Sequence, residues 1–312
     1  MSRYAILFPG QGSQKVGMGT DLFSTRRELL VETADRVLGW SLETLVTQGP
    51  QEELTNTERA QPALYAVSYA LWEALRDALP SSSSPSASAG HSLGEYTALA
   101  ASGALSYEEG LALVAERGRA MAAASTGSDP SGMAALIGAD LEHAERVAAG
   151  RRAEGGRLWV ANVNTPSQIV LAGSRLDIEW LSENARSLGI RRAIPLDVAG
   201  AFHSPYMEPA AERLATALER THFAAPSFPV YANTTGEPVE DPARQLGEQL
   251  IQPVQFAATL ERMVADGITT FIHVGPGDVT AGLVKRTLSD AVVHVVSDLD
   301  GIATVVSDPS VQ

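Results

Sequence analysis

The chain has 312 residues and a formal net charge of −14 at pH 7. This acidic balance argues against nucleic acid or an anionic membrane as a partner, because binding to such surfaces requires an excess of lysine and arginine. Hydrophobic residues make up 45% and charged residues 19% of the chain, a composition typical of soluble globular proteins. No apolar run approaches the roughly 20 residues of a membrane span, and the first residues lack the apolar core of a secretory signal. We expect a soluble, cytoplasmic protein.

Residue usage also limits the chemistry that the chain can perform. It contains no cysteine, which excludes disulfides, thiolate zinc sites and cysteine nucleophiles. Its six histidines include no pair at the three- or four-residue spacing of a helical metal site, so we expect no metal centre. Any covalent catalysis must use another side chain.

The chain begins with a predicted buried strand that runs into a loop. The segment YAILF, from Tyr4, is apolar but too short for a helix, and Pro9 and several closely spaced glycines follow it. The glycines resemble a phosphate-binding loop. However, Lys15 follows Gln14 and precedes Val16, whereas the lysine of a P-loop follows glycine and precedes Ser or Thr. The pattern therefore argues against a nucleotide site.

The next predicted elements are helices on either side of a serine-rich segment. Apolar residues at steps of three and four predict a helix over Gln61–Leu79, with Pro62 in its first turn, where a missing N–H costs little. Residues 80–92 predict a flexible loop, because SASA before Gly90 is a poor candidate for a buried strand. A strand there would have to be imposed by tertiary packing. Two helices, broken near Gly103, are predicted to follow.

Residues 126–198 have a pattern of their own. They are predicted to form a strand, a helix, two strands around an Asn-Thr-Pro-Ser turn, a helix and a strand, and this βαββαβ order is that of the ferredoxin-like unit. We predict an inserted ferredoxin-like subdomain over this range. In the rest of the chain, residues 1–125 and 199–312, strands alternate with helices, which predicts a parallel α/β sheet.

A candidate nucleophile lies in the segment AGHSLGEY, where Gly90 and Gly94 bracket Ser92. In a nucleophile elbow the serine lies on a sharp strand-to-helix turn, and the small residues on either side let the backbone pass without a clash. The following helix would direct free N–H groups and its positive dipole end toward the hydroxyl, where an oxyanion develops. The pattern alone also fits a glycine-bracketed turn with an incidental serine.

A serine hydroxyl needs a base, most often histidine, to take its proton as it attacks. His91 is adjacent to the serine in sequence, but neighbouring side chains at an elbow diverge. His203, in VAGAFHSPYM, falls between a predicted strand and a predicted helix, where α/β enzymes carry active-site groups, and is the better candidate. We expect structural roles for His222, His273 and His294.

Seven motifs, in order along nearly the whole chain, carry a family resemblance. They are FPGQGSQ at 8–14, QPALYAVSYAL at 61–71, GHSLGEY at 90–96, RG at 117–118, FHS at 202–204, QLIQPVQF at 249–256 and HVGPG at 273–277. They resemble the malonyl-CoA:acyl carrier protein transacylases and the related acyltransferases of polyketide synthases. The resemblance implies an α/β-hydrolase-like large subdomain and a serine acyltransferase of fatty acid or polyketide synthesis. It also implies a coenzyme A thioester as substrate and no bound cofactor.

The resemblance implies catalytic roles for individual residues. Ser92 would be acylated, and His203 would be its base and later the acid that releases the thiol. The backbone carbonyl of Gln249 would hold the imidazole, since the family has no carboxylate in that role. Asp197, a short distance before the histidine, is therefore expected to be structural rather than a member of a triad.

The resemblance also implies which groups bind the substrate. The backbone N–H groups of Gln11 and Leu93 would form the oxyanion hole. An arginine on a helix is usually a solvated surface charge, but in the family the arginine matching Arg117 pairs in bidentate fashion with the free carboxylate of a malonyl group. Phe202, beside the histidine, resembles the pattern that selects malonyl over methylmalonyl.

The expected partners are malonyl-CoA and an acyl carrier protein, and we expect the chain to be a monomer. Its negative charge is unfavourable for binding a carrier that is itself acidic. We therefore predict that the carrier contacts basic residues: Arg151, Arg152, Arg157, Arg191, Arg192, Lys285 and Arg286.

Three alternatives stay open. A hydrolase of acyl thioesters on the same scaffold would give the acyl group to water, but it has little use for a buried cation such as Arg117 without a carboxylate partner. A transferase could move a different acyl group between carrier proteins. A non-catalytic carrier-binding module would be expected to have lost Ser92 or His203, and both are present.

Overall fold

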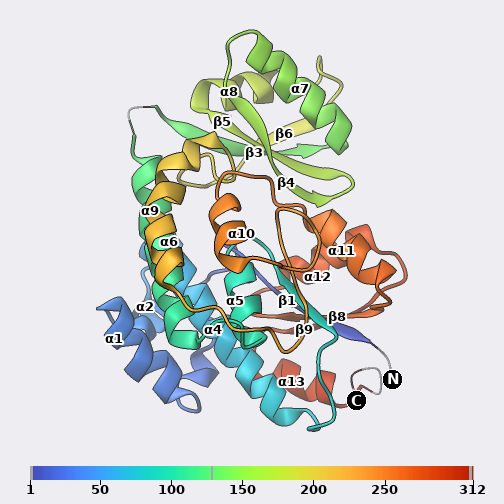
Figure 1. Cartoon of the computed structure of the whole chain (residues 1–312). Helices are drawn as coiled ribbons and strands as arrows, with labels where there is room; N and C mark the ends of the chain where they lie inside the picture. Colours follow the sequence, from blue (N-terminus) through green and yellow to red (C-terminus); the bar gives the residue numbers. More distant parts are fainter. Residues whose placement is uncertain (1–2, 128, 309–310, 312) are drawn as a thin grey trace.

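Two β-sheets organise the chain (Figure 1) in a computed structural model that describes residues 3–127, 129–308 and 311. The first sheet is parallel, in the order β7-β2-β1-β8-β9. Its strands are β1 (Tyr4–Phe8), β2 (Ala87–Gly90), β7 (Val230–Tyr231), β8 (Thr270–Val274) and β9 (Val292–Val296). The second sheet is antiparallel, in the order β4-β5-β3-β6. Its strands are β3 (Ser131–Ile137), β4 (Leu158–Thr165), β5 (Gln168–Ser174) and β6 (Arg192–Pro195).

Helices connect the strands of both sheets. Before β3 they are η1 (Thr20–Leu22), η2 (Glu28–Thr33), α1 (Ala34–Leu38), α2 (Leu42–Gln48), α3 (Gln51–Thr55), α4 (Thr57–Ala78), α5 (Gly94–Ala101) and α6 (Tyr107–Ser125). Between β3 and β6 they are α7 (Leu141–Ala153) and α8 (Arg175–Asn184). After β6 they are η3 (Pro205–Met207), α9 (Glu208–Arg220), α10 (Pro242–Glu248), α11 (Phe256–Ala265), α12 (Val279–Thr287) and α13 (Leu299–Val306). The predicted α/β class, with one parallel and one separate antiparallel sheet, is confirmed.

The parallel sheet is covered on both faces, as β1 shows. All five of its residues are buried. Tyr4, Ile6 and Phe8 pack into a core shared with α4, α5 and α6, whereas Ala5 and Leu7 pack into a second core shared with α11 and α12. Alternate residues of a strand point to opposite faces, so a strand with both faces covered has an unbroken apolar sequence.

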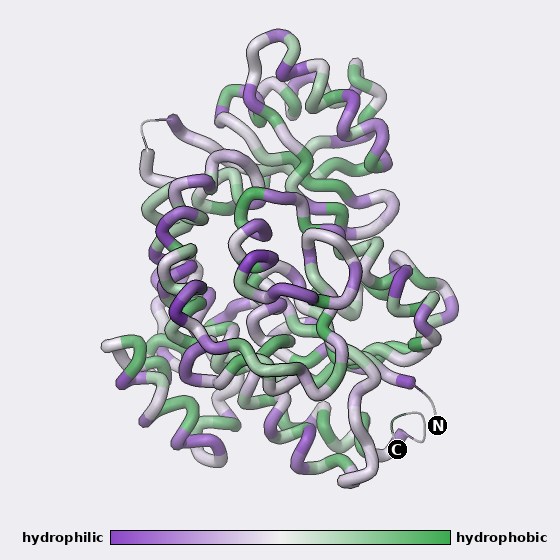
Figure 2. The backbone as a smooth tube through the Cα atoms, in the orientation of Figure 1, coloured by the Kyte–Doolittle hydropathy of each residue, from purple (hydrophilic) through white to green (hydrophobic). Residues whose placement is uncertain are grey.

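The outer helices bury one face each, and hydrophobic and hydrophilic residues alternate along them (Figure 2). In α9, for example, the buried residues Ala210, Leu214 and Leu218 recur at every fourth position. No helix of the described residues is long and apolar enough to cross a membrane. The cytoplasmic location and the monomeric state expected from the sequence stay predictions.

The serine-rich segment corrects one prediction. Ala87–Gly90 form β2, a fully buried strand between β1 and β7, where we expected a loop. Its residues pair with β1 from Ala5 opposite Ala87 to Phe8 opposite Gly90. Small residues with weak strand propensity adopt this conformation because the neighbouring strands satisfy their backbone groups. Tertiary packing therefore imposes the strand.

The start of α4 corrects a second prediction. The helix begins at Thr57, about one turn before the expected start, and the side chain of Asn56 accepts a hydrogen bond from the N–H of Glu58. Pro62 therefore lies inside the helix rather than in its first turn. The prediction was wrong because this first turn is polar and falls outside the apolar pattern.

The second sheet has the topology of the predicted ferredoxin-like unit. Its first strand, β3, lies between β5 and β6, and β4 forms an edge. The sheet also touches the rest of the chain through its backbone. Val163 donates to the carbonyl of Val254 at 2.8 Å, and Val254 donates to the carbonyl of Ala161 at 2.9 Å. The boundaries predicted at 126 and 198 stay predictions.

Candidate active site

Ser92 lies on the turn between β2 and α5. Its φ is 51°, a left-handed conformation that is costly for a residue with a side chain. A Cβ atom on Gly90 would lie 1.9 Å from the carbonyl carbon of Gly94, and one on Gly94 would lie 2.3 Å from the carbonyl oxygen of Phe8. Neither position has room for a side chain. The local geometry is that of a nucleophile elbow.

The imidazole of His203 lies next to the Ser92 hydroxyl. Its Nε2 is 2.8 Å from Ser92 Oγ, and its Nδ1 is 2.7 Å from the carbonyl oxygen of Gln249. A proton on Nδ1 bonds that carbonyl, which leaves Nε2 free to accept the hydroxyl proton. Burial and the nearby charge of Arg117 lower the pKa of His203 to about 3, so the ring is neutral at pH 7.

His203 shares an unusual backbone conformation with the serine. Its φ is 56°, and among the described residues Ser92 and His203 are the two non-glycine residues with positive φ. Such strain persists only where surrounding contacts hold it, and it concentrates at functional sites.

The guanidinium of Arg117 is also part of this cluster. The side chain extends from α6 and is 1% exposed. It donates to three neutral acceptors: Gln61 Oε1 at 2.7 Å, Ser92 Oγ at 2.9 Å and Gln249 Oε1 at 2.9 Å. Its Nε is buried without a hydrogen-bond partner. Within the described chain the cation forms no ion pair, so it is free to bind an anionic ligand.

Two backbone N–H groups that have no acceptor among the described residues belong to the elbow and to the loop that lies against it. A Cβ atom on Gly10 would lie 2.5 Å from the carbonyl oxygen of His91, so the loop after β1 passes directly against the elbow. Within the described part of the chain, the N–H groups of Gln11 and Leu93 donate to no other atom. Both are therefore available to an oxyanion on a substrate.

These groups line a cavity of about 400 Å³. The second sheet forms one wall of it, with side chains from β3, β4 and β5: Met133, Asn162, Asn164, Gln168 and Val170. Other side chains come from α6, the segment before η3, and α12: Met121, Phe202, Val279, Leu283 and Arg286. The cavity therefore lies between the parts of the chain that carry the two sheets.

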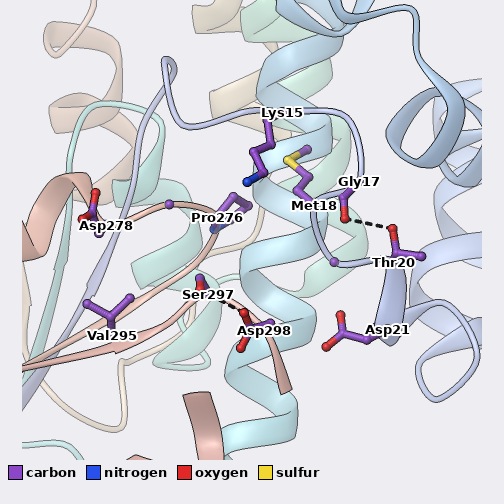
Figure 3. A pocket seen from close by; sticks show the side chains of 12 residues that line it. Lys15, Gly17, Met18, Thr20, Asp21, Pro276, Asp278, Val295, Ser297 and Asp298 are labelled. Carbon is purple, nitrogen blue, oxygen red and sulfur yellow. Dashed lines mark hydrogen bonds between the residues drawn. The ribbon is translucent and has the colours of Figure 1, made fainter. Parts of the chain in front are cut away.

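A second cavity, of about 700 Å³, is lined by the segment that follows β1 and by residues within 276–278 and 295–298 (Figure 3). Lys15 lines it, with three carboxylates from Asp21, Asp278 and Asp298. Two of these carboxylates bond the start of α13: Asp21 accepts from the N–H of Leu299, and Asp298 accepts from that of Gly301. Ser92, His203 and Arg117 do not line this cavity.

The other candidates from the sequence form no hydrogen bond with the Ser92 hydroxyl, whose partners in the described chain are His203 and Arg117. Asp197 is exposed at the rim of the smaller cavity, and the Nδ1 of His203 bonds Gln249 instead. The Nε2 of His91 is 2.7 Å from Asn164 Oδ1. His273 is buried and bonds Thr280 and Gly275.

Sequence reasoning missed two buried polar residues, Glu95 and Asn233. Asn233 Oδ1 accepts from the N–H of Ser92 at 2.6 Å, and its Nδ2 donates to the carbonyl of Gly90 at 2.6 Å. Glu95 Oε2 accepts from Gln249 Nε2 at 2.6 Å and from the N–H of Asn233 at 3.1 Å. Glu95 could have been found from the sequence, because it is a lone carboxylate in the apolar sequence of α5. For Asn233 the sequence offers none.

An elbow serine beside a neutral histidine is the arrangement of serine-dependent acyl-transfer enzymes. The family model of the acyl transferase domain matches residues 6–306. The chain therefore belongs to the acyl transferase domain family.

Individual relatives cover almost the whole chain. The malonyl CoA-acyl carrier protein transacylase of Bacillus subtilis (strain 168) is 41% identical over 307 residues, which are 97% of this chain and 96% of the relative. The Coxiella burnetii transacylase structure superposes with a TM-score of 0.91 at 32% identity, covering 98% of this chain and 97% of that chain. A malonyl-transacylase in complex with a type II polyketide synthase acyl-carrier protein gives a TM-score of 0.90 at 36% identity, covering 97% and 98%.

Proposed function

We propose that the chain transfers a malonyl group from malonyl-CoA to the phosphopantetheine thiol of an acyl carrier protein. One observation carries the proposal: Ser92 Oγ lies 2.8 Å from His203 Nε2 and 2.9 Å from a nitrogen of Arg117. A nucleophile, its base and a buried cation thus meet at one atom. The names of the relatives, at 35–41% identity over nearly the whole chain, support the same reaction.

The reaction has two halves that use the same groups. In the first, His203 Nε2 takes the hydroxyl proton as Ser92 Oγ attacks the thioester carbonyl. The N–H groups of Gln11 and Leu93 stabilise the oxyanion. The carbon–sulfur bond then breaks, and His203 returns the proton to the departing sulfur. Coenzyme A leaves, and the malonyl ester stays on Ser92.

The second half reverses these roles for a new thiol. His203 takes the proton of the carrier thiol as the sulfur attacks the ester carbonyl, and it then protonates the departing oxygen of Ser92. The bond to Gln249 keeps the ring in the tautomer that both halves require.

Arg117 supplies the selectivity for an acyl group with a free carboxylate. Its present acceptors are neutral, and a carboxylate in the cavity would form stronger, charge-assisted bonds with the guanidinium. An acetyl group would leave the buried cation without that partner.

The test is the intact mass of the protein after brief incubation with malonyl-CoA, acetyl-CoA or methylmalonyl-CoA. We expect a malonyl increment that requires Ser92 and disappears when a phosphopantetheinylated carrier is added. Accumulation of free malonate without an adduct would establish the hydrolase instead. If none of the three thioesters gave an adduct, the acyl group would be a different one.

We propose further that the carrier binds the exposed basic residues near the cavity. Of the seven basic residues predicted from the sequence, Arg151 pairs with Asp177 at 2.6 Å and Arg157 pairs with Asp129. Arg286 is exposed and lines the cavity. Charge reversal of Lys285 and Arg286 should slow transfer to the carrier more than charge reversal of Arg151 does. Equal effects would contradict this placement.

We propose finally that residues 1–125 and 199–312 form the catalytic subdomain and residues 126–198 the ferredoxin-like one. Two observations support these limits: α6 ends at Ser125, and β3 to β6 all lie within residues 131–195. Under this division the first subdomain carries the reacting groups, and the second provides a wall of the cavity.

A further inference from the structure

Two buried ionisable side chains lie close to the nucleophile, and the mechanism above uses one of them. Arg117 and Glu95 are each 1% exposed. They do not touch, because the side-chain amide of Gln249 lies between them. Its Nε2 donates to Glu95 Oε2 at 2.6 Å, and its Oε1 accepts from Arg117 at 2.9 Å. One neutral amide therefore links a buried carboxylate to a buried guanidinium.

The other titratable groups around this pair are neutral at pH 7. From the turns, His203 and His91 face it, and burial lowers the pKa of both. From α5, Tyr96 faces it, and burial raises the pKa of its hydroxyl. At pH 8, where the carboxyl of Glu95 is mostly ionised, Glu95 and Arg117 therefore set the charge of this buried site, one negative and one positive. Unbalanced charge is costly in such surroundings because little solvent screens it.

We propose that Glu95 balances the charge of the acyl pocket: its carboxylate is ionised while Arg117 has no anionic ligand, and it takes up a proton when a malonyl carboxylate pairs with Arg117. The inference rests on the proposed function, because it requires a malonyl group at this site. A malonyl carboxylate would add a second negative charge beside a single cation, and a proton from solvent on Glu95 restores neutrality. No covalent bond to Glu95 forms or breaks.

The titration range of Glu95 suits this role. Burial raises its pKa to about 7, against the opposing effects of the hydrogen bonds from Gln249 and Asn233 and of the Arg117 charge. At pH 8 the carboxyl of the empty enzyme is therefore mostly ionised. Once Arg117 is neutralised by a ligand, one of the effects that lower the pKa of Glu95 is lost, so its pKa rises further.

A pH effect on selectivity follows. At pH 8 the binding of a malonyl group requires Glu95 to take up a proton from solvent. An acetyl group brings no charge, so its binding requires no proton uptake. Lowering the pH from 8 to 6 should therefore favour malonyl over acetyl loading by up to about tenfold in all, because the one-proton uptake changes the ratio only above the pKa of about 7 that Glu95 has in the empty enzyme. In a Glu95→Gln variant this dependence should disappear.

The deciding experiment counts protons. Native protein in weak buffer at pH 8 is mixed with malonyl-CoA beside a pH indicator, and the acyl-enzyme formed is measured by mass. We expect uptake approaching one proton per malonyl-enzyme in the native protein and none in Glu95→Gln. Ionisation of the released coenzyme A thiol contributes equally to both. As a control, Asp177→Asn removes another buried carboxylate, which lies in α8 at the second sheet, and should leave the uptake intact.

The outcomes separate this inference from the proposed function. Equal proton counts in the native protein and Glu95→Gln would overturn the role of Glu95 while the malonyl adduct itself stands. Absence of any malonyl-enzyme would overturn both, and the mass measurement would show this first. If Glu95→Gln does not fold, the native protein decides alone: malonyl loading must take up more protons per acyl-enzyme than acetyl loading, and equal counts would overturn the inference.

Discussion

The parts of the chain that carry the two sheets contribute differently to the cavity. The part with the parallel sheet holds Ser92, His203 and Arg117, two of them in strained backbone conformations and all of them in one hydrogen-bonded cluster. The second sheet contributes wall side chains from strands in which no described non-glycine residue has a positive φ. The comparison teaches that, in the proposed reaction, a few groups fixed by the core carry the chemistry, whereas the wall shapes the space. Substitutions in the two parts should therefore differ in effect by orders of magnitude.

The largest effect should come from Ser92→Ala. It removes the atom that carries the acyl group in the proposed reaction, so we expect no acyl-enzyme and a loss of transfer rate on the order of 10⁶-fold. The measurement is the rate of malonyl transfer to a carrier, together with the mass after incubation. Thermal unfolding serves as the control for folding. A persistent covalent adduct in this variant would place the nucleophile elsewhere.

The next largest effect should come from Arg117→Ala. It removes the cation that we propose to pair with the malonyl carboxylate, and charge-assisted bonds of this kind contribute about 1.5–3 kcal/mol each. We expect the ratio of malonyl to acetyl loading to fall by roughly 10²-fold or more. Competition between the two thioesters, read by mass, measures the ratio. An unchanged ratio would show that the wall, rather than the buried cation, selects the acyl group.

A smaller effect should follow from Gln168→Ala in the wall. The side chain lies at the start of β5 and lines the cavity, but it forms no hydrogen bond with Ser92 or His203. We expect the rate of acylation to change by less than about tenfold, with the ratio of malonyl to acetyl loading retained. Steady-state kinetics with both thioesters test this. A fall in the malonyl-to-acetyl ratio as large as that of Arg117→Ala would contradict the distinction between the reacting groups and the wall.

The smallest effect should come from lowering the pH from 8 to 5, a range in which His203 stays neutral. The neutral ring is the active base, and because its pKa is lowered to about 3, this form persists well below the ordinary pKa of 6.5. In the Glu95→Gln variant, where the nearby carboxyl no longer titrates, we expect the acylation rate to vary by less than about twofold over this range. A half-maximal rate near pH 6.5 would show a solvated imidazole.

The sequence predicted the residues of the candidate site better than the buried residues that hold them in place, for a physical reason. The elbow at Ser92 is specified locally, since a side chain on Gly90 or Gly94 would overlap the backbone. The motifs around Arg117 and His203 are likewise short and contiguous. The hydrogen bonds of Asn233 to the elbow join residues more than 140 positions apart, and no local pattern encodes them.

The fold shows the same limit. The apolar run of β1 and the periodicity of the second sheet region were sufficient to predict their elements. The strand at Ala87–Gly90 was not predicted, because its conformation comes from pairing with β1 and β7 rather than from its own residues. Propensity is a weak guide where both neighbours are already in place.

The short segment from Gln249 to Val254 connects the catalytic base to the wall of the cavity. At one end its carbonyl holds the imidazole of His203, and at the other Val254 pairs with β4 through two backbone bonds. This short segment therefore joins the wall of the cavity to the residue that orients the base. A ligand that forces the two sheets apart strains the same short segment and draws the carbonyl away from the ring. A ligand that fits the wall poorly should therefore also disturb the alignment of His203 with the Ser92 hydroxyl.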